Sequence, residues 1–426
     1  MPQKIPARRA EHKLHSSTTD CLRKRGVCPI PAEPVQPNME KLNILLSTES
    51  LRPPMTGIGY YTLNLLQLLR SHPCINSVIC FPSNAEQITG KEYEKKSFQT
   101  RIRNNLSTRF REIGRSLPGT YLLDFWLRSR RFQHWSRTHK HSVYHEPSYI
   151  LKSYLGPSVV TVHDLSHVHF TEFHPKERVK FLDRRLPKTL KEAAHILTPS
   201  YATRDEIIRS FDLSPNKITA IHSGVSRVFR AIRSEETLEV MKKYHLSHKQ
   251  YILSVATFEP RKNLKGLLTA YQKLDKSIKE NMPLVLIGAR GWKNSDADSH
   301  IRRLVDRGEV RVLGYVEFQE LPILYAAATA FAFLSFYEGF GLPLVEAMAC
   351  GTPVLTSNAS CMPEVAGNAA IFANPYDPSD IAGKLSELLE NTALQDTLIS
   401  RGLLRAGEMT WEKCVAKTVE VYRTVA

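Results

Sequence analysis

Two glutamates occupy the stretch of the chain where the residue types and their spacing suggest chemistry. Glu338 and Glu346 lie in EGFGLPLVEAMACGTPVLT, which runs from Glu338 to Thr356. The apolar run before this stretch predicts a buried strand, and Pro343 suits the first turn of a helix. Glu338 then precedes the helix and Glu346 lies about one turn inside it, so the two acids can contact different parts of one elongated ligand. Alternatively, Glu338 is a solvated loop acid.

The backbone between these glutamates forms a candidate phosphate site. Gly339 and Gly341 let the loop approach a ligand closely, because glycine has no side chain and permits positive φ. Free N–H groups at the start of the helix, near Phe340, Gly341 and Leu342, can bind a phosphate at the carboxyl edge of a parallel sheet.

Two adjacent cations, Arg261 and Lys262, follow a second predicted strand, Tyr251 to Ala256. Arginine offers a planar fork of donors and lysine a point charge, so the pair suits a diphosphate. A charged surface loop is the alternative interpretation.

A histidine and a pair of glycines stand in comparable places in the first half of the chain. His163 follows the predicted strand Ser158 to Val162, and the carboxyl end of such a strand faces the ligand crevice of an α/β domain. Gly57 and Gly59 lie in a predicted loop between the strand Lys41 to Ser47 and an amphipathic helix, which is the layout of a phosphate-approach loop. A hydrogen-bonded structural histidine and a tight turn are the alternatives.

The elements that must position these residues alternate between strand and helix in both halves of the chain. This alternation predicts an α/β protein with two doubly wound parallel sheets, and 426 residues suffice for two domains. The predicted organisation is a disordered, proline-rich tail (1–38), a first Rossmann-like domain (39–226), a linker (227–249), a second Rossmann-like domain (250–410) and a terminal helix (411–426). Met39 could be the true start.

The pattern F-x-E-G-F-G-L-P-x-x-E-A-M-A-x-G-x-P-V around Glu338 resembles the donor-site signature of the retaining glycosyltransferases of family 4. The resemblance covers about residues 40–426. It implies the GT-B fold, in which an acceptor-side domain and a nucleotide-sugar-binding domain face each other across a cleft and the last helix returns to the first domain. It also implies transfer of a hexose from a nucleoside-diphosphate sugar with retention at the anomeric carbon.

By this resemblance, the residues of the reaction site are Glu338, His163, Lys262 and Arg261. Glu338 is expected to hold hydroxyls of the transferred sugar, and His163 to contact that sugar from the other domain. Lys262 is expected to hold the donor phosphates. Arg261 would replace an arginine that many family members carry several residues earlier, where this chain has Ala256, Thr257 and Phe258.

The remaining donor contacts follow from the same resemblance. Glu346 is expected to accept hydrogen bonds from the ribose, and Gly57 and Gly59 to face the diphosphate across the cleft. Gly314 and Val316 are expected in the loop that seats the base, and Glu364 near the donor edge. No metal or other cofactor is expected, and the D-x-D pattern at 296–298 is interpreted as an exposed loop.

Two further segments, TFEPRKN and PKTLKEAAHILTPS, look most like those of transferases that add mannose or rhamnose during bacterial O-antigen or capsule assembly. This favours a GDP-sugar over a UDP-sugar as donor and a lipid-linked saccharide or a polysaccharide as acceptor. The base-site residues do not separate guanine from uracil.

The formal charge of +16 and a pI near 9.5 predict an anionic partner. Residues 91–140 carry 13 Lys or Arg against 4 acids, interleaved with aromatic residues. Such a segment can adsorb to an anionic membrane. Each basic residue near the surface contributes about 1 kcal/mol to the binding free energy. A solvated face with aromatic anchors and a nucleic-acid site are the alternatives, although no nucleic-acid module is recognisable.

The chain shows no apolar run of membrane-spanning length and no signal-peptide core, and its seven cysteines have no paired spacing. We therefore expect a cytoplasmic protein attached to the inner face of the cytoplasmic membrane. Two other classes stay open: a basic protein that binds nucleic acid or lipid, and a GT-B-like protein without catalytic activity. The second is disfavoured because Glu338, Glu346 and Lys262 are all present.

Overall fold

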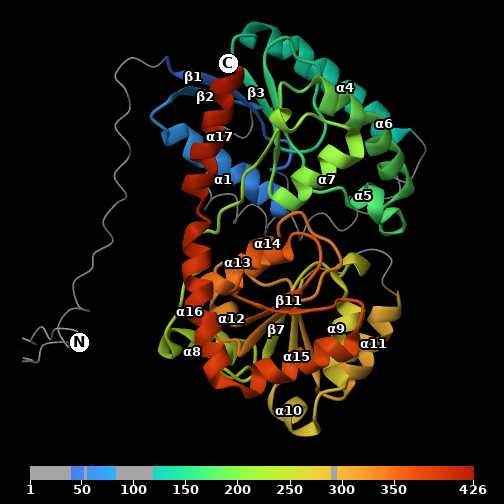
Figure 1. Ribbon diagram of the computed structural model, residues 1–426, viewed down its shortest axis with the longest axis vertical. Coiled ribbons are helices and arrows are strands. Elements are labelled where there is room, and N and C mark those ends of the chain that lie inside the picture. Colours follow the sequence, from blue (N-terminus) through green and yellow to red (C-terminus); the bar gives the residue numbers. More distant parts are fainter. Residues whose placement is uncertain (1–39, 52–54, 83–118, 289–294) are drawn as a thin grey trace, which may run out of the picture. The chain divides into compact units, whose positions relative to one another are not determined.

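The computed structural model describes residues 40–51, 55–82, 119–288 and 295–426, with only the backbone for 295–299 (Figure 1). The predicted tail 1–38, Met39 and residues 91–118 of the basic region lie outside these ranges. The described elements belong to one compact unit, Lys41–Ala426.

The first half of the unit is built on a six-stranded parallel sheet in the order β2-β1-β3-β4-β5-β6. Its strands are short, mostly apolar runs, as expected where helices cover both faces of a parallel sheet. The strands are β1 (Leu42–Ser47), β2 (Ile75–Phe81), β3 (Val143–Glu146), β4 (Ser158–Thr161), β5 (His195–Thr198) and β6 (Ile218–Ala220). The helices that accompany them are α1 (Gly57–Ser71), α4 (Thr120–Ser136), α5 (Ser166–His169), α6 (Lys176–Glu192) and α7 (Tyr201–Phe211). We call this sheet and its helices the first domain.

The second domain is built on another six-stranded parallel sheet, in the order β12-β11-β10-β7-β8-β9. The strands are β7 (Ile252–Val255), β8 (Leu284–Ile287), β9 (Val310–Gly314), β10 (Ala330–Phe333), β11 (Val354–Ser357) and β12 (Ile371–Ala373). The helices are α8 (Ser234–Lys243), α9 (Leu264–Gln272), α10 (Lys276–Asn281), α11 (Ser295–Asp306), α12 (Leu321–Ala326), α13 (Leu342–Ala349), α14 (Met362–Ala366), α15 (Pro378–Glu390) and α16 (Thr392–Glu408). The predicted α/β class with two doubly wound parallel sheets is confirmed.

The strand order shows where a ligand crevice is expected in the second sheet. In the second sheet the chain runs outward from β7 through β8 to β9, and then outward on the other side from β10 through β11 to β12. Strand order therefore reverses between β7 and β10, and ligands of such sheets bind beyond the carboxyl ends of the strands at that reversal. The loops that follow β7 and β10 carry Arg261, Lys262 and Glu338.

The last helix, α17 (Trp411–Val425), packs on the first domain beside α1 (Figure 1). Trp411 and Tyr422 are buried in the same apolar cluster as Leu65 and Leu66 of α1. The Tyr422 hydroxyl lies 2.6 Å from Nδ1 of the buried His145 on β3.

The chain passes between the domains twice, and the two passages are paired. The N–H of Val225 donates to the carbonyl of Met409 at 2.9 Å, and Val225 forms a parallel bridge with Thr410. At Gly224 a Cβ atom would lie 2.1 Å from the backbone nitrogen of Trp411, so only glycine fits there.

Several local predictions differ from the structure. Gly57 and Gly59 are not in a loop, because α1 begins at Gly57 after an extended Thr56, and both glycines form the first helical turn. The predicted linker 227–249 contains α8, whose Val240 and Met241 are buried in the core of the second domain. The backbone at 296–298 lies in α11 rather than in a loop. The exact domain boundaries stay a prediction.

Candidate active site

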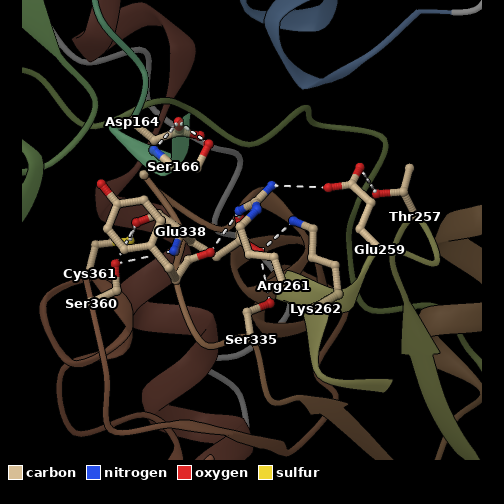
Figure 2. Close-up of polar contacts among 12 residues, drawn as sticks. Asp164, Ser166, Thr257, Glu259, Arg261, Lys262, Ser335, Glu338, Ser360 and Cys361 are labelled. Atoms are coloured by element: carbon tan, nitrogen blue, oxygen red, sulfur yellow. Dashed lines mark hydrogen bonds and ion pairs between the residues drawn. The ribbon is translucent and has the colours of Figure 1, made fainter. Parts of the chain in front are cut away.

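The side chain of Glu338 lies between the two cations that follow β7 (Figure 2). Its Oε2 accepts a hydrogen bond from Nη1 of Arg261 at 2.9 Å, and its Oε1 accepts from Nζ of Lys262 and from Oγ of Ser335, the latter at 2.8 Å. The three charged side chains are largely buried, with exposed fractions of 9% for Glu338, 11% for Arg261 and 14% for Lys262. The structure thus brings together three of the predicted site residues as a buried ion cluster.

The backbone of Glu338 is also held. Its carbonyl accepts from Oγ of Ser360 at 2.6 Å and from Sγ of Cys361 at 3.2 Å, both in the loop after β11 (Figure 2). Loops that follow three neighbouring strands, β7, β10 and β11, therefore meet at this one residue.

The charges of this cluster depend on one another. Burial alone would raise the pKa of Glu338, but Arg261 and Lys262 lower that pKa below its ordinary value, so the carboxylate is ionised. Burial lowers the pKa of Lys262, and the neighbouring Glu338 opposes this. The second ion partner of Arg261 is Glu259, 3.7 Å away, and Nε of Arg261 is buried without a hydrogen-bond partner among the described residues.

Helix α13 begins four residues after Glu338 in the sequence, at Leu342. Its N-cap is Gly341, whose φ of 86° is one that glycine adopts without strain, and Pro343 is in the first turn. Phe340 is buried under this turn, and Leu342 is the first helical residue. The predicted helix start behind a glycine loop is therefore present.

Glu346 lies within α13. Its Oε2 accepts a hydrogen bond from the hydroxyl of Tyr325 at 3.0 Å. Burial raises the pKa of Glu346 to about 7, and the hydrogen bond from Tyr325 opposes part of that rise. Near neutral pH, the carboxyl group of Glu346 is therefore partly ionised and partly protonated.

His163 lies just beyond the carboxyl end of β4, as predicted. Its Nε2 is 2.8 Å from the carbonyl of Pro147, and its ring makes edge contacts with Tyr61 and Tyr149. Burial lowers the pKa of His163, so the ring is neutral near pH 7. At Gly339 a Cβ atom would lie 1.7 Å from the carbonyl oxygen of His163, so the glycine loop and the histidine segment are in direct contact.

The neighbour of His163, Asp164, was not predicted to belong to the site. Its Oδ1 accepts from the N–H and the hydroxyl of Ser166 at 3.0 and 2.8 Å (Figure 2). Burial would raise the pKa of Asp164, but Arg261 of the other domain and the bonds from Ser166 lower it to about 2. An acid directly after a strand-end histidine was the available sequence signal.

The other predicted donor contacts lie around this cluster. Gly57 is near α13, since a Cβ atom on it would lie 3.9 Å from Cδ1 of Leu342, whereas a Cβ on Gly59 would press against Met55 of its own segment. Gly314 ends β9 with a φ of 68°, and Val316 is buried just beyond it. Strand β9 is two strands from β7 in the same parallel sheet, so this pair is at the same carboxyl edge of the sheet as Arg261.

Glu364 joins the domains. Its two carboxylate oxygens accept from the N–H groups of Tyr201 and Ala202, both at 2.8 Å, at the start of α7. Nε2 of His222 lies 2.6 Å from the same carboxylate. The structure therefore gives Glu364 contacts with the first domain, which sequence reasoning could not foresee.

Across residues 40–51, 55–82, 119–288 and 300–426, no cluster of three or more His, Cys, Asp or Glu is arranged to hold a metal ion. Within that part of the chain, none of the helices has the length and apolarity needed to cross a membrane.

Comparison with known proteins gives consistent matches over both domains. Residues 55–228 match the family described as Glycosyltransferase Family 4, and residues 237–405 match Glycosyl transferases group 1. The chain is 37% identical to O-antigen chain mannosyltransferase B of Escherichia coli, over 90% of this chain and 100% of the relative. It is 26% identical to O-antigen chain mannosyltransferase RfbU of Salmonella typhimurium, over 76% of this chain and 84% of the relative. Among solved structures, sucrose-phosphate synthase of Thermosynechococcus elongatus aligns with a TM-score of 0.68 at 17% identity, over 90% of this chain and 99% of that one.

Proposed function

The chain belongs to the glycosyltransferases of group 1 and family 4 and has their GT-B fold, and from this premise we propose that it transfers mannose from GDP-mannose during assembly of an O-antigen chain. The two relatives named above are O-antigen chain mannosyltransferases, and one of them aligns along its whole length. The acceptor would be the growing saccharide on its lipid carrier. The alternative of a nucleic-acid-binding or non-catalytic protein is not favoured.

The observation that carries the proposal is the buried ion cluster at the strand-order reversal of the second sheet. Arg261 and Lys262 bring two positive charges to the edge where such sheets bind phosphates, and both pair with the carboxylate of Glu338. The Nε of Arg261 is a buried donor without a hydrogen-bond partner among the described residues. A diphosphate would satisfy that donor.

Donor binding would then exchange partners within the cluster. The diphosphate of the donor would take over Arg261 and Lys262, and Glu338 would turn to hydroxyls of the sugar beside the reacting carbon. Departure of the diphosphate develops negative charge, which fixed cations stabilise without rearrangement during the reaction. The N–H groups at the start of α13 would supplement them.

Glu346 and its partner Tyr325 would bind the nucleoside. A ribose with two hydroxyls can donate to the Glu346 carboxylate, and such hydrogen bonds to a charged acceptor are stronger than those between neutral groups. The hydrogen bond from Tyr325 fixes the orientation of that carboxylate.

His163 would contact the sugar from the first domain, and its contact with Gly339 places it beside the loop that carries Glu338. We propose further that the reaction proceeds with retention, as the family resemblance implies, and without a metal ion, because Arg261 and Lys262 would supply the positive charge that stabilises the leaving group. Contact between the domains would exclude water and limit hydrolysis of the donor.

The test is calorimetric titration of EDTA-treated protein with GDP-mannose, UDP-glucose and ADP-glucose. Selective binding of GDP-mannose in the micromolar range, lost in Glu346→Ala, is expected. Transfer to an O-antigen acceptor followed by NMR of the new anomeric centre would test retention. If none of the nucleotide sugars binds, the donor-site proposal fails.

We also propose that the protein attaches to anionic membranes through α4. Three large apolar side chains on this helix, Leu123, Trp126 and Leu127, are 59%, 47% and 48% exposed. Leu123 and Trp126 line a cavity of about 530 Å³ together with Arg184 and Arg185 of α6, and the guanidinium of Arg130 lies 4.4 Å from the centre of the Trp126 ring. Exposed apolar groups beside arginines are typical of surfaces that adsorb to anionic lipid.

A further inference from the structure

The side chain of Tyr337 crosses from the second domain into the first. Tyr337 directly precedes Glu338 in the loop after β10. Its hydroxyl donates a hydrogen bond to Oε2 of Glu206 on α7 at 2.5 Å and accepts one from the N–H of Leu165 at 2.9 Å. Both partners belong to the first domain, so this hydroxyl joins the loop after β10, which carries Glu338, to the first domain.

Tyr337 is fixed on its own side as well. Its carbonyl accepts from Nη1 of Arg261 at 2.7 Å, and the N–H of the preceding Phe336 donates to the carbonyl of Arg261 at 3.0 Å. The guanidinium that binds Glu338 therefore also binds the backbone of Tyr337. The position of the tyrosine backbone is set by the candidate diphosphate site.

The surroundings of the ring belong to the first domain. Its centre lies 5.6 Å from that of Phe170 and 5.8 Å from that of His169, and the residue is only 9% exposed. The imidazole Nε2 of His169 contacts Oε1 of Glu206, so the acceptor of the hydroxyl is itself held in place. Burial and the nearby carboxylates of Asp164 and Glu206 raise the pKa of Tyr337, so the hydroxyl keeps its proton.

The first-domain partners of Tyr337 lie beside the predicted sugar contact. Leu165 is two residues beyond His163, and the carbonyl of His163 touches Gly339, two residues beyond Tyr337. The carbonyl of Gly339 accepts from Oγ of Ser200 at 2.7 Å. The segment carrying Glu338 is thus held by the first domain on both sides of that residue.

We propose that Tyr337 is a positioning residue, which sets the placement of His163 relative to Glu338 through its hydrogen bonds to Leu165 and Glu206. The inference rests on the proposed glycosyl transfer, in which those two residues act on one sugar from opposite domains. A misplacement of about 1 Å between reacting groups can cost about 100-fold in rate. A buried hydroxyl with two partners specifies such a placement because its loss removes one hydrogen bond from each partner.

Removal of the hydroxyl should separate donor binding from turnover. The three charged donor contacts, Arg261, Lys262 and Glu346, are in the second domain, and the Tyr337 hydroxyl bonds to none of them. Tyr337→Phe should therefore leave the Kd for GDP-mannose within about twofold of wild type. The loss of hydrogen bonds to a charged acceptor and an amide should lower kcat about 10- to 100-fold. Less exact placement should also raise the ratio of donor hydrolysis to transfer.

The experiment compares the full chain carrying Tyr337→Phe, Glu206→Ala and Glu206→Gln. The matched control is Tyr251→Phe, which removes another buried hydroxyl whose hydrogen bond, to the carbonyl of Leu324 at 2.6 Å, stays within the second domain. Donor Kd, kcat, the hydrolysis-to-transfer ratio and hydrogen exchange of the Leu165 amide are measured for each. Glu206→Gln retains an acceptor and should lose less turnover than Glu206→Ala.

The expected result is a fall in kcat, a higher hydrolysis ratio and faster exchange of the Leu165 amide in Tyr337→Phe and Glu206→Ala, with none of these in Tyr251→Phe. The inference is overturned if Tyr337→Phe keeps the wild-type kcat and hydrolysis ratio, or if donor Kd weakens in parallel with kcat. Slow Leu165 exchange in Tyr337→Phe would also overturn it. If wild-type protein transfers no sugar, the proposed function fails instead, while the exchange measurement still reports on the Tyr337 contact.

Discussion

Replacing Glu346 by glutamine should remove a pH-dependent part of both stability and donor binding. Burial raises the pKa of this carboxyl from an ordinary value of 4.5 to about 7. A group whose folded-state pKa is raised contributes stability that is present in full below the unfolded pKa and is lost as pH rises through the folded pKa. At about 1.4 kcal/mol per pH unit, the gap corresponds to about 3 kcal/mol lost between pH 4.5 and pH 7.

The melting temperature reports that loss. Glutamine has the same shape and no charge, so the Tm of Glu346→Gln should rise relative to wild type as the pH increases from 5 to 8. For a domain of this size, about 3 kcal/mol corresponds to roughly 6–12 °C. A constant difference between the two proteins from pH 5 to pH 8 would refute the buried titration.

Donor binding should show the opposite pH trend. Ribose hydroxyls donate to an ionised Glu346, so binding must release its proton below pH 7, and wild-type affinity should rise up to tenfold per pH unit until it levels off above pH 7. The titration uses GDP-mannose, because its diphosphate is esterified at both ends and does not itself titrate near neutral pH. Glu346→Gln should bind weakly and without pH dependence. Wild-type affinity that stays flat from pH 5.5 to pH 8, with no proton released, would contradict the proposed ribose contact.

The other predictions concern the remaining site groups and the membrane. Lys262→Ala should weaken GDP-mannose binding about 10- to 100-fold by calorimetry, because a charge-assisted contact is lost; unchanged affinity would exclude Lys262 from the phosphate site. Glu338→Gln should lower kcat much more than it alters the donor Kd, and equal small effects would contradict its contact with the sugar. EDTA should leave the transfer rate unchanged, whereas inhibition reversed by Mg²⁺ would show a metal requirement. Trp126→Glu should reduce flotation with phosphatidylglycerol vesicles relative to wild type, without changing the Kd for the donor. Equal flotation of the two proteins would exclude α4 as the membrane contact.

The architecture could be predicted because it depends on local patterns. Apolar runs such as Leu284–Ile287 alternate with helical segments, and that alternation alone requires parallel sheets with crossover helices. The cations were predicted to suit a diphosphate from their place after a strand, and the family resemblance assigned Glu338 to the same donor; the structure joins the three side chains directly.

Contacts between distant segments could not be predicted in this way. The partners of Tyr337 are 131 and 172 residues away in sequence, and nothing in the local pattern of Glu206 or Leu165 distinguishes them from other residues. Helix α8 was missed because its charged residues dominate the composition, while only a narrow stripe that includes Val240 and Met241 is buried. The start of α1 was misplaced because the first helical turn has no internal N–H partners, so glycine costs little there.

The return of α17 to the first domain has a consequence for biosynthesis. Leu65 and Leu66 of α1 share their apolar core with Trp411 and Tyr422, which follow the whole second domain in the sequence. The first domain therefore cannot reach its final packing until the second domain has been synthesised. A stop codon or a protease cut just before Trp411 would leave the second domain attached to a first domain with an open apolar face.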